Sequence, residues 1–216
     1  MKKPEKGTKE RLLDIAEELF AERGIQATSL RAITKKAGAN LAAVNYHFRS
    51  KEALVEAVFA RRLIPLNQER IKLLDEAEAA AENGVLSIEA VLRAFFIPEF
   101  HLWEEGPLFV RLSDRLQYEP DAKIHDFFMK HFRETVRRYD AAITRALPEV
   151  PRKELYWRMH FLIGGMVHTC MWLADLEELS GGICCASDIP FMLDRLIAFG
   201  IAGLRAPVPP MREESR

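Results

Sequence analysis

The spacing of the apolar residues is the feature of this chain that most constrains its fold. Apolar side chains recur at intervals of three and four, as they do between Leu12 and Phe20, and no segment alternates regularly between apolar and polar residues. The first pattern is typical of amphipathic helices, whereas alternation would indicate half-buried strands. The chain has 216 residues and 49% of them are hydrophobic, so it can bury a sizeable core. We therefore predict an all-α protein of about nine helices.

Three short helices and then a longer one are expected in the first part of the chain. Each is expected to begin at a capping side chain, and glycines are expected to end the first two. The expected caps are Thr8, Thr28 or Ser29, Asn40 and Ser50, and the expected stops are Gly24 and Gly38. Short helices joined by tight turns in this way predict a helix-turn-helix module of roughly sixty residues.

Longer helices are expected further along the chain. Pro65 interrupts the fourth helix, but the apolar spacing resumes beyond it, so a kink is expected there rather than an end. Five more helices are expected at about 87–100, 107–118, 120–147, 152–179 and 187–204. The Pro-rich, charged tail at 207–216 is expected to be disordered.

Charge is distributed unevenly along the chain. Residues 1–62 hold thirteen Lys and Arg against eight Asp and Glu, whereas the whole chain has a net charge of −1. A basic N-terminal block on an acidic body suits a protein that touches phosphate at one end. The three cysteines form neither a disulfide framework nor a metal motif, and we expect neither a signal peptide nor a membrane-spanning segment. We expect a soluble, cytoplasmic protein without a cofactor or metal.

The segment from Ala37 to Leu54 reads AGANLAAVNYHFRSKEAL and predicts a short helix that protrudes from the module. Its apolar side is reduced to Val44 and Phe48, so the other side chains face outward. They are small or able to form hydrogen bonds, which suits insertion into the DNA major groove. The Asn45 amide can bind adenine through two hydrogen bonds, and the neighbouring alanines can pack on thymine methyl groups.

Phosphate contacts are expected around this helix. Tyr46 and His47 are placed to hydrogen-bond phosphates, and Lys51 adds a positive charge at a helix N-terminus. The cap region at Thr28 and Ser29 is a second candidate phosphate site. A wider basic rim is formed by Arg11, Arg31, Lys35 and Arg49, with Lys2, Lys3 and Lys6 as a short arm. The alternative is a helical bundle whose charges are simply solvated.

The N-terminal module resembles that of TetR-family transcriptional regulators. The matching segments are Ile15–Gly24, Thr28–Ile33, Ala37–Gly38 and Tyr46–Leu54. The resemblance implies a helix-turn-helix DNA-binding domain at 1–52 and a helical effector-binding and dimerisation domain at 53–206, followed by the tail. With this resemblance, the predicted DNA-binding residues are Thr28, Ser29, Arg31, Asn40, Leu41, Ala42, Ala43, Asn45, Tyr46, His47 and Lys51. Asn45 stands where the family often has tyrosine, which affects the expected base preference.

Dimerisation is expected through the helices at 152–179 and 187–204. The first is apolar nearly all round between Phe161 and Ala174, and such a helix must be covered on every side. Spacing alone is equally compatible with a core inside one chain, but the resemblance implies a dimer built from the last two long helices. The predicted interface residues are Leu162, Met166, Cys170, Leu173, Ile189, Leu193, Leu196, Ile197, Gly200 and Leu204. Two recognition helices in a twofold dimer would read a near-palindromic operator.

An effector pocket is expected among aromatic and soft apolar side chains of the second domain, although ordinary core packing is the favoured explanation for any one of them taken singly. The predicted lining is Phe96, Phe100, Trp103, Phe109, Leu112, Leu116, Phe127, Met166, His168 and Trp172. His168 lies within an apolar run, so its ring needs a polar partner, either in the protein or on a ligand. The segments 40–48 and 150–161 are similar to a fatty-acid-responsive subgroup, which implies a fatty acid or acyl-CoA as effector. An aromatic compound is also compatible.

The favoured function is a ligand-responsive regulator, most simply a repressor that a small apolar effector releases from DNA. Two other classes stay open. One is an all-α enzyme, although no catalytic or metal-binding motif is found. The other is an interaction module that does not bind DNA, which the basic N-terminal block disfavours. We expect no enzymatic activity and no membrane partner.

Overall fold

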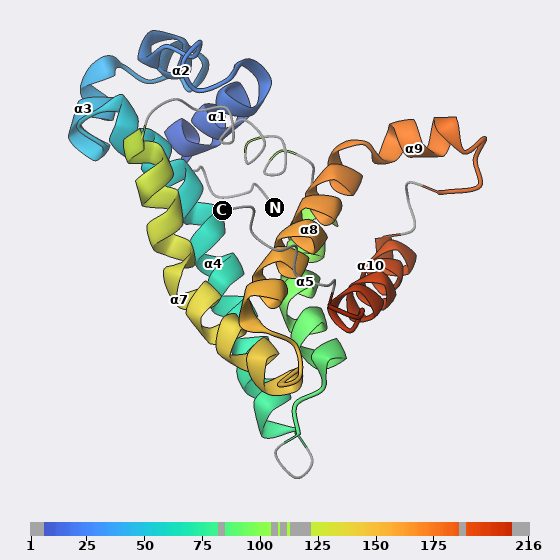
Figure 1. Ribbon diagram of the computed structural model, residues 1–216. Helices are drawn as coiled ribbons and strands as arrows, with labels where there is room; N and C mark the ends of the chain where they lie inside the picture. Colours follow the sequence, from blue (N-terminus) through green and yellow to red (C-terminus); the bar gives the residue numbers. More distant parts are fainter. Residues whose placement is uncertain are drawn as a thin grey trace, which may run out of the picture. The chain divides into compact units, whose positions relative to one another are not determined.

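The structure is a computed structural model that describes residues 7–81, 85–104, 108, 112, 122–185 and 189–208. This part of the chain contains nine helices and no strand, so the all-α prediction is confirmed (Figure 1). The helices are α1 (Thr8–Arg23), α2 (Leu30–Lys36), α3 (Leu41–His47), α4 (Lys51–Ala79), α5 (Ile88–Glu104), α7 (Ala122–Ala146), α8 (Arg152–Met171), α9 (Leu173–Leu179) and α10 (Ile189–Leu204). None of the described helices is long and apolar enough to cross a lipid bilayer.

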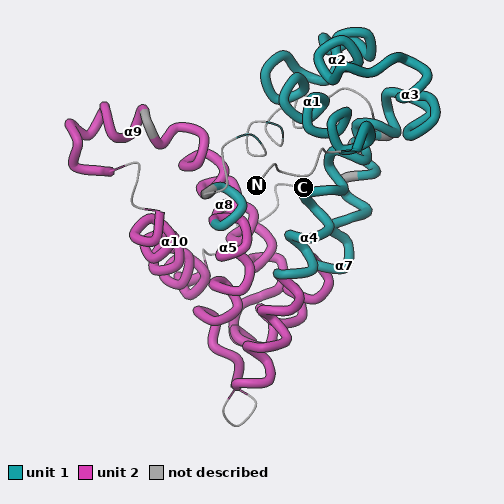
Figure 2. The backbone as a smooth tube through the Cα atoms, turned by 180° about the vertical axis from the view of Figure 1, so that it is seen from behind, with its two compact units in different colours: residues 1–69, 101–135 teal, residues 70–100, 136–216 magenta. Residues whose placement is uncertain are grey.

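Two compact units make up the chain (Figure 2). Unit 1 comprises residues 1–69 and 101–135, and unit 2 comprises residues 70–100 and 136–216. The boundary falls within α4, α5 and α7, because each of these long helices begins in one unit and ends in the other. This division by packing differs from the domain bounds predicted from sequence, where the break was placed between residues 52 and 53.

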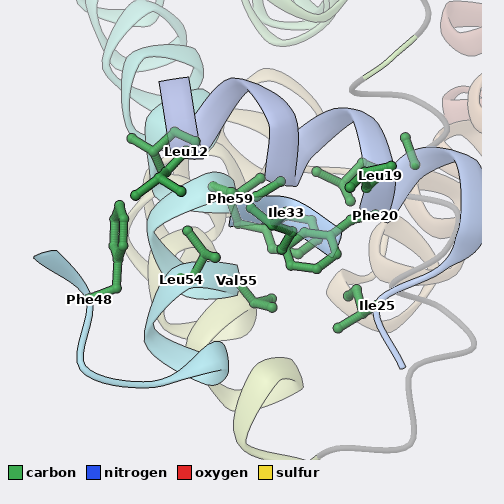
Figure 3. Close-up of a cluster of buried hydrophobic side chains, with 14 of the residues drawn as sticks. Leu12, Leu19, Phe20, Ile25, Ile33, Phe48, Leu54, Val55 and Phe59 are labelled. Carbon is green, nitrogen blue, oxygen red and sulfur yellow. The ribbon is translucent and has the colours of Figure 1, made fainter. Parts of the chain in front are cut away.

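The core of unit 1 is built where α1, α2 and the first half of α4 turn their apolar faces toward one another (Figure 3). Leu12, Leu19 and Phe20 of α1, Ile33 of α2 and Phe59 of α4 are almost completely buried. Each such side chain contributes about 1.5–3 kcal/mol through removal of apolar surface from water. The three α1 residues follow the predicted three- and four-residue spacing, so the sequence pattern explains this part of the core directly.

Capping at the starts of the short helices follows the prediction in three of four places. Ser29 accepts a hydrogen bond from the Ala32 backbone N–H at 3.2 Å, and Asn40 accepts one from Ala43 at 2.9 Å. Ser50 accepts one from the Ala53 N–H at 3.1 Å at the start of α4. Thr8, in contrast, is the first residue of α1, whose cap is Gly7 and has no side-chain hydrogen bond. The prediction for Thr8 was therefore one residue out.

The core of unit 2 includes a close contact between α8 and α10. Gly200 of α10 is buried, and a Cβ atom added to it would lie 2.7 Å from Leu162 Cδ2 and 3.2 Å from Leu92 Cδ1. Ile197 and Leu204 flank the glycine along the same buried face of α10. The missing side chain at Gly200 is thus what lets the two helices approach.

Two predicted helices differ from what is observed. The expected single helix at 152–179 breaks at Trp172, whose φ of −111° and ψ of 21° separate α8 from α9. The expected helix at 107–118 falls largely outside the described residues, of which only 108 and 112 belong to it. Residues 209–216 of the predicted disordered tail and the basic arm at Lys2, Lys3 and Lys6 also lie outside them. Helix α4 continues through Pro65, as expected.

Candidate nucleic-acid interface

Helix α3 is held to the rest of unit 1 by one narrow apolar side. Val44 is fully buried, and Phe48 just after the helix is nearly so; both belong to the unit 1 core (Figure 3). The Phe48 N–H closes the helix by donating to the Val44 carbonyl at 2.8 Å. These two anchors fix the rotation of α3 about its own axis, so the identity of the exposed residues follows from them.

The remaining positions of α3 are open to solvent. Leu41, Ala42, Asn45 and Tyr46 are exposed, and Tyr46 keeps 83% of its surface accessible. Ala43 and His47 are half-buried, and the His47 ring meets the edge of the Tyr46 ring with centroids 4.9 Å apart. A helix that leaves an amide, a phenol, a leucine and small side chains in water offers both the hydrogen-bonding and the apolar groups that read base edges in the major groove.

The flanks of α3 supply further polar groups. Ser29, Arg31 and Asn40 are exposed, although the Ser29 hydroxyl and the Asn40 carbonyl oxygen are already engaged as helix caps. Lys51, the first residue of α4, is half-buried, and its Nζ donates to the Gln26 carbonyl at 3.3 Å. The lysine therefore ties the start of α4 to the loop before α2, while its ammonium retains further N–H groups for an anion.

Thr28 is not part of this exposed surface, and the prediction that it contacts DNA is wrong. Only 1% of the residue is accessible, and its hydroxyl donates toward the Leu19 carbonyl at 3.1 Å and the Gly24 carbonyl at 2.8 Å. The Thr28 hydroxyl thus binds carbonyl groups at the end of α1, while the neighbouring Ser29 caps α2. From the sequence, either hydroxyl residue could have been the cap of α2, and the packing of α1 against α2 determines which one is.

A buried carboxylate joins α1 to α4. Glu17 is 1% exposed and accepts hydrogen bonds from Arg61 and Arg62, the latter from Nε at 2.9 Å. Asp14 accepts a further bond from Arg61 Nη1 at 2.6 Å. Sequence reasoning did not identify this cluster, although acidic residues three apart on α1 and the Arg61–Arg62 pair were its visible signals. The cluster couples the helix-turn-helix segment firmly to α4.

Arg11, predicted as part of the basic rim, serves a structural purpose as well. Its Nε donates to the Ala37 carbonyl at 3.3 Å, across the end of α2. This bond helps to hold the turn between α2 and α3. Lys36 likewise pairs with Glu18 at 2.7 Å on the surface of the unit.

The predicted effector-lining residues are divided between the two units. Phe96, Phe100 and Met166 are buried in unit 2, whereas Leu112 is buried and Trp103 and Phe127 are half-buried in unit 1. Phe109 and Leu116 lie outside the described residues. His168 and Trp172 are exposed, with their rings stacked at a centroid distance of 6.0 Å. The expectation that His168 needs a buried polar partner is therefore corrected, because solvent reaches the residue.

Unit 2 also contains a buried arginine that sequence reasoning missed. Arg70 is 2% exposed; its Nε donates to the Phe95 carbonyl at 2.9 Å and its Nη2 to Glu99 at 2.6 Å. Its guanidinium lies over the Phe95 ring, 4.2 Å from the centroid. Burial lowers the Arg70 pKa, and the Glu99 charge opposes that shift. The only sequence signal was a cationic residue on the apolar side of a helix.

Six of the ten predicted dimer residues are buried within the single chain, so only for these six does burial contradict a contact with a partner; for the other four the interface stays a prediction. Leu162, Met166, Leu173, Ile197, Gly200 and Leu204 are buried within the single chain, and Ile189, Leu193 and Leu196 are half-buried. Cys170 is half-buried too, and burial raises the pKa of its thiol to about 12. The intrachain core, which spacing alone had left open, applies to the buried residues, and within it Leu162 lies against Gly200.

Large aromatic side chains are exposed on the opposite sides of these helices. On α8, Trp157 stacks on Phe161 with ring centroids 5.8 Å apart, and 66% of Phe161 is accessible. On α10, 72% of Phe199 is accessible, and Arg195 lies over the ring of exposed Phe191 at 4.4 Å. Contiguous exposed apolar patches, in contrast to single exposed residues, are typical of interaction sites.

Comparisons with known proteins agree with this arrangement. Residues 12–58 match the model of the bacterial regulatory proteins of the tetR family, and residues 89–203 match the model of the tetracyclin repressor-like C-terminal domain. The transcriptional repressor KstR2 of Rhodococcus jostii is 46% identical over 52 residues, which cover 24% of this chain and 26% of the repressor. KstR2 of Mycolicibacterium smegmatis is 36% identical over 75 residues, or 35% of this chain and 37% of that repressor. These alignments span only about a quarter to a third of the curated relatives.

Solved structures share the fold along nearly the whole chain. FadR, the fatty acid degradation regulator of Bacillus halodurans, superposes with a TM-score of 0.71 at 13% identity and covers 95% of this chain and 100% of its own. FadR of Bacillus subtilis, solved in complex with stearoyl-CoA, gives a TM-score of 0.66 at 12% identity over 90% of this chain and 98% of its own. The matched helix-turn-helix segment and the matched C-terminal domain together show that this chain belongs to the TetR family of transcriptional regulators.

Proposed function

We propose that this protein is a ligand-responsive repressor that leaves its operator when a small apolar effector binds the helical domain. The observation that carries the DNA-binding part is the exposed surface of α3. Val44 and Phe48 anchor the helix from behind, so Asn45 and Tyr46 are free to meet a duplex. KstR2, which is similar over the N-terminal segment, is itself a transcriptional repressor.

In this proposal α3 enters the major groove. The Asn45 amide reads a base edge, the alanines before it pack on thymine methyl groups, and Tyr46 and His47 bind flanking phosphates. Lys51 contributes positive charge at the N-terminus of α4. Ser29 and Arg31 are proposed as phosphate contacts from the start of α2, where both are exposed.

We propose a twofold dimer in which the exposed sides of α8 and α10 meet those of a second copy. Trp157 and Phe161 on α8 and Phe191 and Phe199 on α10 provide the apolar core of this four-helix interface. To read successive major grooves, the two α3 helices of such a dimer must lie about 34–36 Å apart. The operator is therefore expected to be near-palindromic.

The effector is proposed to act through α4. This helix holds α1 through the buried Glu17 cluster, so a displacement of α4 would carry the helix-turn-helix segment with it. The effector must bind the DNA-incompetent state more tightly, and a nearly complete switch needs a preference of about 10⁴-fold. A fatty acid or acyl-CoA is favoured over an aromatic compound because FadR of Bacillus subtilis, which shares the fold, was solved with stearoyl-CoA.

The DNA-binding proposal is tested by selecting bound duplexes from a random pool and measuring affinities for the recovered operator. Asn45→Ala should lose about 1–3 kcal/mol of discrimination at one base pair in each half-site. Lys51→Ala should weaken binding to all DNA sequences alike, and should reduce the slope of log K against log salt by about the value for one released counterion. Unchanged base preference in Asn45→Ala would refute its reading role, and a loss confined to one sequence would refute a phosphate role for Lys51.

The effector proposal is tested by native mass spectrometry of the purified protein, followed by titration of the protein–operator complex with stearoyl-CoA. We expect the spectrum to show a dimer that carries the extra mass of a co-purified acyl compound. We also expect stearoyl-CoA to release the protein from DNA. Acetyl-CoA is the matched control, since it carries the same head group without the long apolar chain. Equal release by both compounds, or by neither, would contradict an acyl-chain sensor.

A further inference from the structure

Arg49 has an unusual backbone conformation at the end of the recognition helix. Its φ is +69°, and it is the one non-glycine residue with a positive φ in the described part of the chain. The described residues with positive φ elsewhere are Gly24, Gly38, Gly181 and Gly182. Side chains disfavour this region because Cβ approaches the following carbonyl oxygen, and glycine or asparagine is the usual occupant. The chain thus keeps an arginine where a smaller residue would be less strained.

The turn itself does not depend on the arginine side chain. The Arg49 backbone N–H donates to the carbonyls of Val44 and Asn45, both at 3.2 Å, and so completes the end of α3. Any residue that tolerates this φ, glycine included, can make these bonds. The Ser50 hydroxyl then caps α4 independently. Closure of the helix therefore does not explain an arginine at this position.

The Arg49 side chain is free to bind a ligand. It is exposed, and its guanidinium forms no hydrogen bond or ion pair with the part of the chain that the structure describes. Lys51, two residues later, is half-buried, and its ammonium donates to the Gln26 carbonyl. Of the two cations that flank Ser50, Lys51 is partly held by this hydrogen bond, whereas Arg49 has no such bond to the described part of the chain.

We propose that Arg49 is a DNA-phosphate contact, held beside α3 by the strained turn. The inference rests on the proposed entry of α3 into the major groove. Arg49 follows the C-terminus of the helix, whereas base edges are read mainly from the N-terminal part of a recognition helix, so its guanidinium is assigned to the backbone rather than to a base. A guanidinium binds phosphate through two parallel N–H groups, which suits this position.

The competing explanation is that Arg49 only balances the negative end of the α3 dipole. That role needs no DNA and would appear in the stability of the free protein alone. The phosphate contact would appear in DNA affinity and in its salt dependence. The two explanations therefore predict changes in different measurements.

The test measures binding to a fluorescein-labelled, mixed-sequence duplex by anisotropy across a series of salt concentrations. Non-specific binding is sufficient here, because phosphate contacts supply most of it. Arg49→Gln should weaken binding by about tenfold at low salt and lower the slope of log K against log salt by about 0.9. Arg49→Lys should keep the wild-type slope. Arg205→Gln is the control for loss of one exposed charge and should bind like wild type.

Arg49→Gly separates charge from backbone strain. It relieves the strained φ but removes the guanidinium, so it should bind DNA as weakly as Arg49→Gln. Wild-type affinity and slope in Arg49→Gln would overturn the proposal, as would recovery of binding in Arg49→Gly, which would assign the effect to the turn. Failure of the wild-type protein to bind any duplex would instead refute the proposed function on which the inference depends.

Discussion

Helix α3 leaves small or hydrogen-bonding side chains exposed, such as Ala42, Asn45 and Tyr46, whereas α8 and α10 leave the bare rings of Phe161 and Phe199 exposed. The two surfaces require different partners. A surface of polar and mostly small side chains can hydrogen-bond to the edges of bases and to phosphates, whereas an exposed aromatic surface is stabilised when another surface removes it from water. This difference supports the proposals that α3 binds DNA and that the exposed sides of α8 and α10 meet a second copy of the chain.

The two regions also differ in how they are held in place. The helix-turn-helix segment combines an apolar core with the buried Glu17 cluster, which fixes α1 against α4 through charged hydrogen bonds. The contact of α8 with α10 depends on close apolar packing around Gly200. Three variants test this difference, and they follow in order of decreasing expected effect.

The largest effect is expected when the exposed rings of α8 and α10 are replaced together. Phe161→Glu with Phe199→Glu would bury four unpaired carboxylates in each dimer, so dimer affinity should fall at least about 100-fold. Sedimentation velocity would report the change from dimer to monomer. Val136→Glu replaces a similarly exposed apolar residue of α7 and is the control. A double variant that stays dimeric would place the interface elsewhere.

A smaller effect is expected when the buried carboxylate is neutralised. Glu17→Gln removes the charge that Arg61 and Arg62 share, and should lower the free energy of unfolding by about 2 kcal/mol, since both arginines keep some access to solvent. Urea unfolding at a fixed protein concentration would measure it. The neighbouring Glu18 pairs with Lys36 on the surface, so Glu18→Gln should cost no more than about 0.5 kcal/mol. Equal losses in both variants would show that burial of the cluster contributes nothing extra.

The smallest effect is expected at the α8–α10 contact. Gly200→Ala would place a methyl group against Leu162, and the crowding should outweigh the better helix propensity of alanine by about 1 kcal/mol. Gly203→Ala is the matched control on the same helix, because a Cβ there meets no atom within 4 Å. It should be neutral or stabilising by up to about 1 kcal/mol in thermal unfolding. A stabilising Gly200→Ala would mean that Leu162 moves aside easily.

Residues near the N-terminus could be placed largely from sequence, because their local signals agree with one another. The caps at Ser29, Asn40 and Ser50 and the apolar spacing of α1 predicted where helices begin and which sides are buried. Each of these signals acts over three or four residues, so no knowledge of the rest of the molecule is needed. With Val44 and Phe48 on the buried side, the helix period also predicts which side of α3 faces outward.

The inner and outer sides of α8 and α10 could not be assigned in this way. A helix that is apolar nearly all round has no periodicity from which its buried side can be read, so Leu162 and Phe161 are equivalent in sequence. Which side is buried depends on which side chains fit the space left by the other helices. Leu162 faces inward because Gly200, which has no side chain, leaves room for it.

An all-helical protein with an exposed α3 can be predicted from the order of residues, because helix periodicity and capping are local properties of the chain. Other features appear only when the chain has packed: Thr28 closes α1 instead of facing solvent, Arg70 is buried against Phe95, and certain aromatic rings remain exposed. These outcomes depend on atoms brought together from distant parts of the chain. Burial is a property of the packed molecule, and a residue's own neighbours in sequence do not fix it.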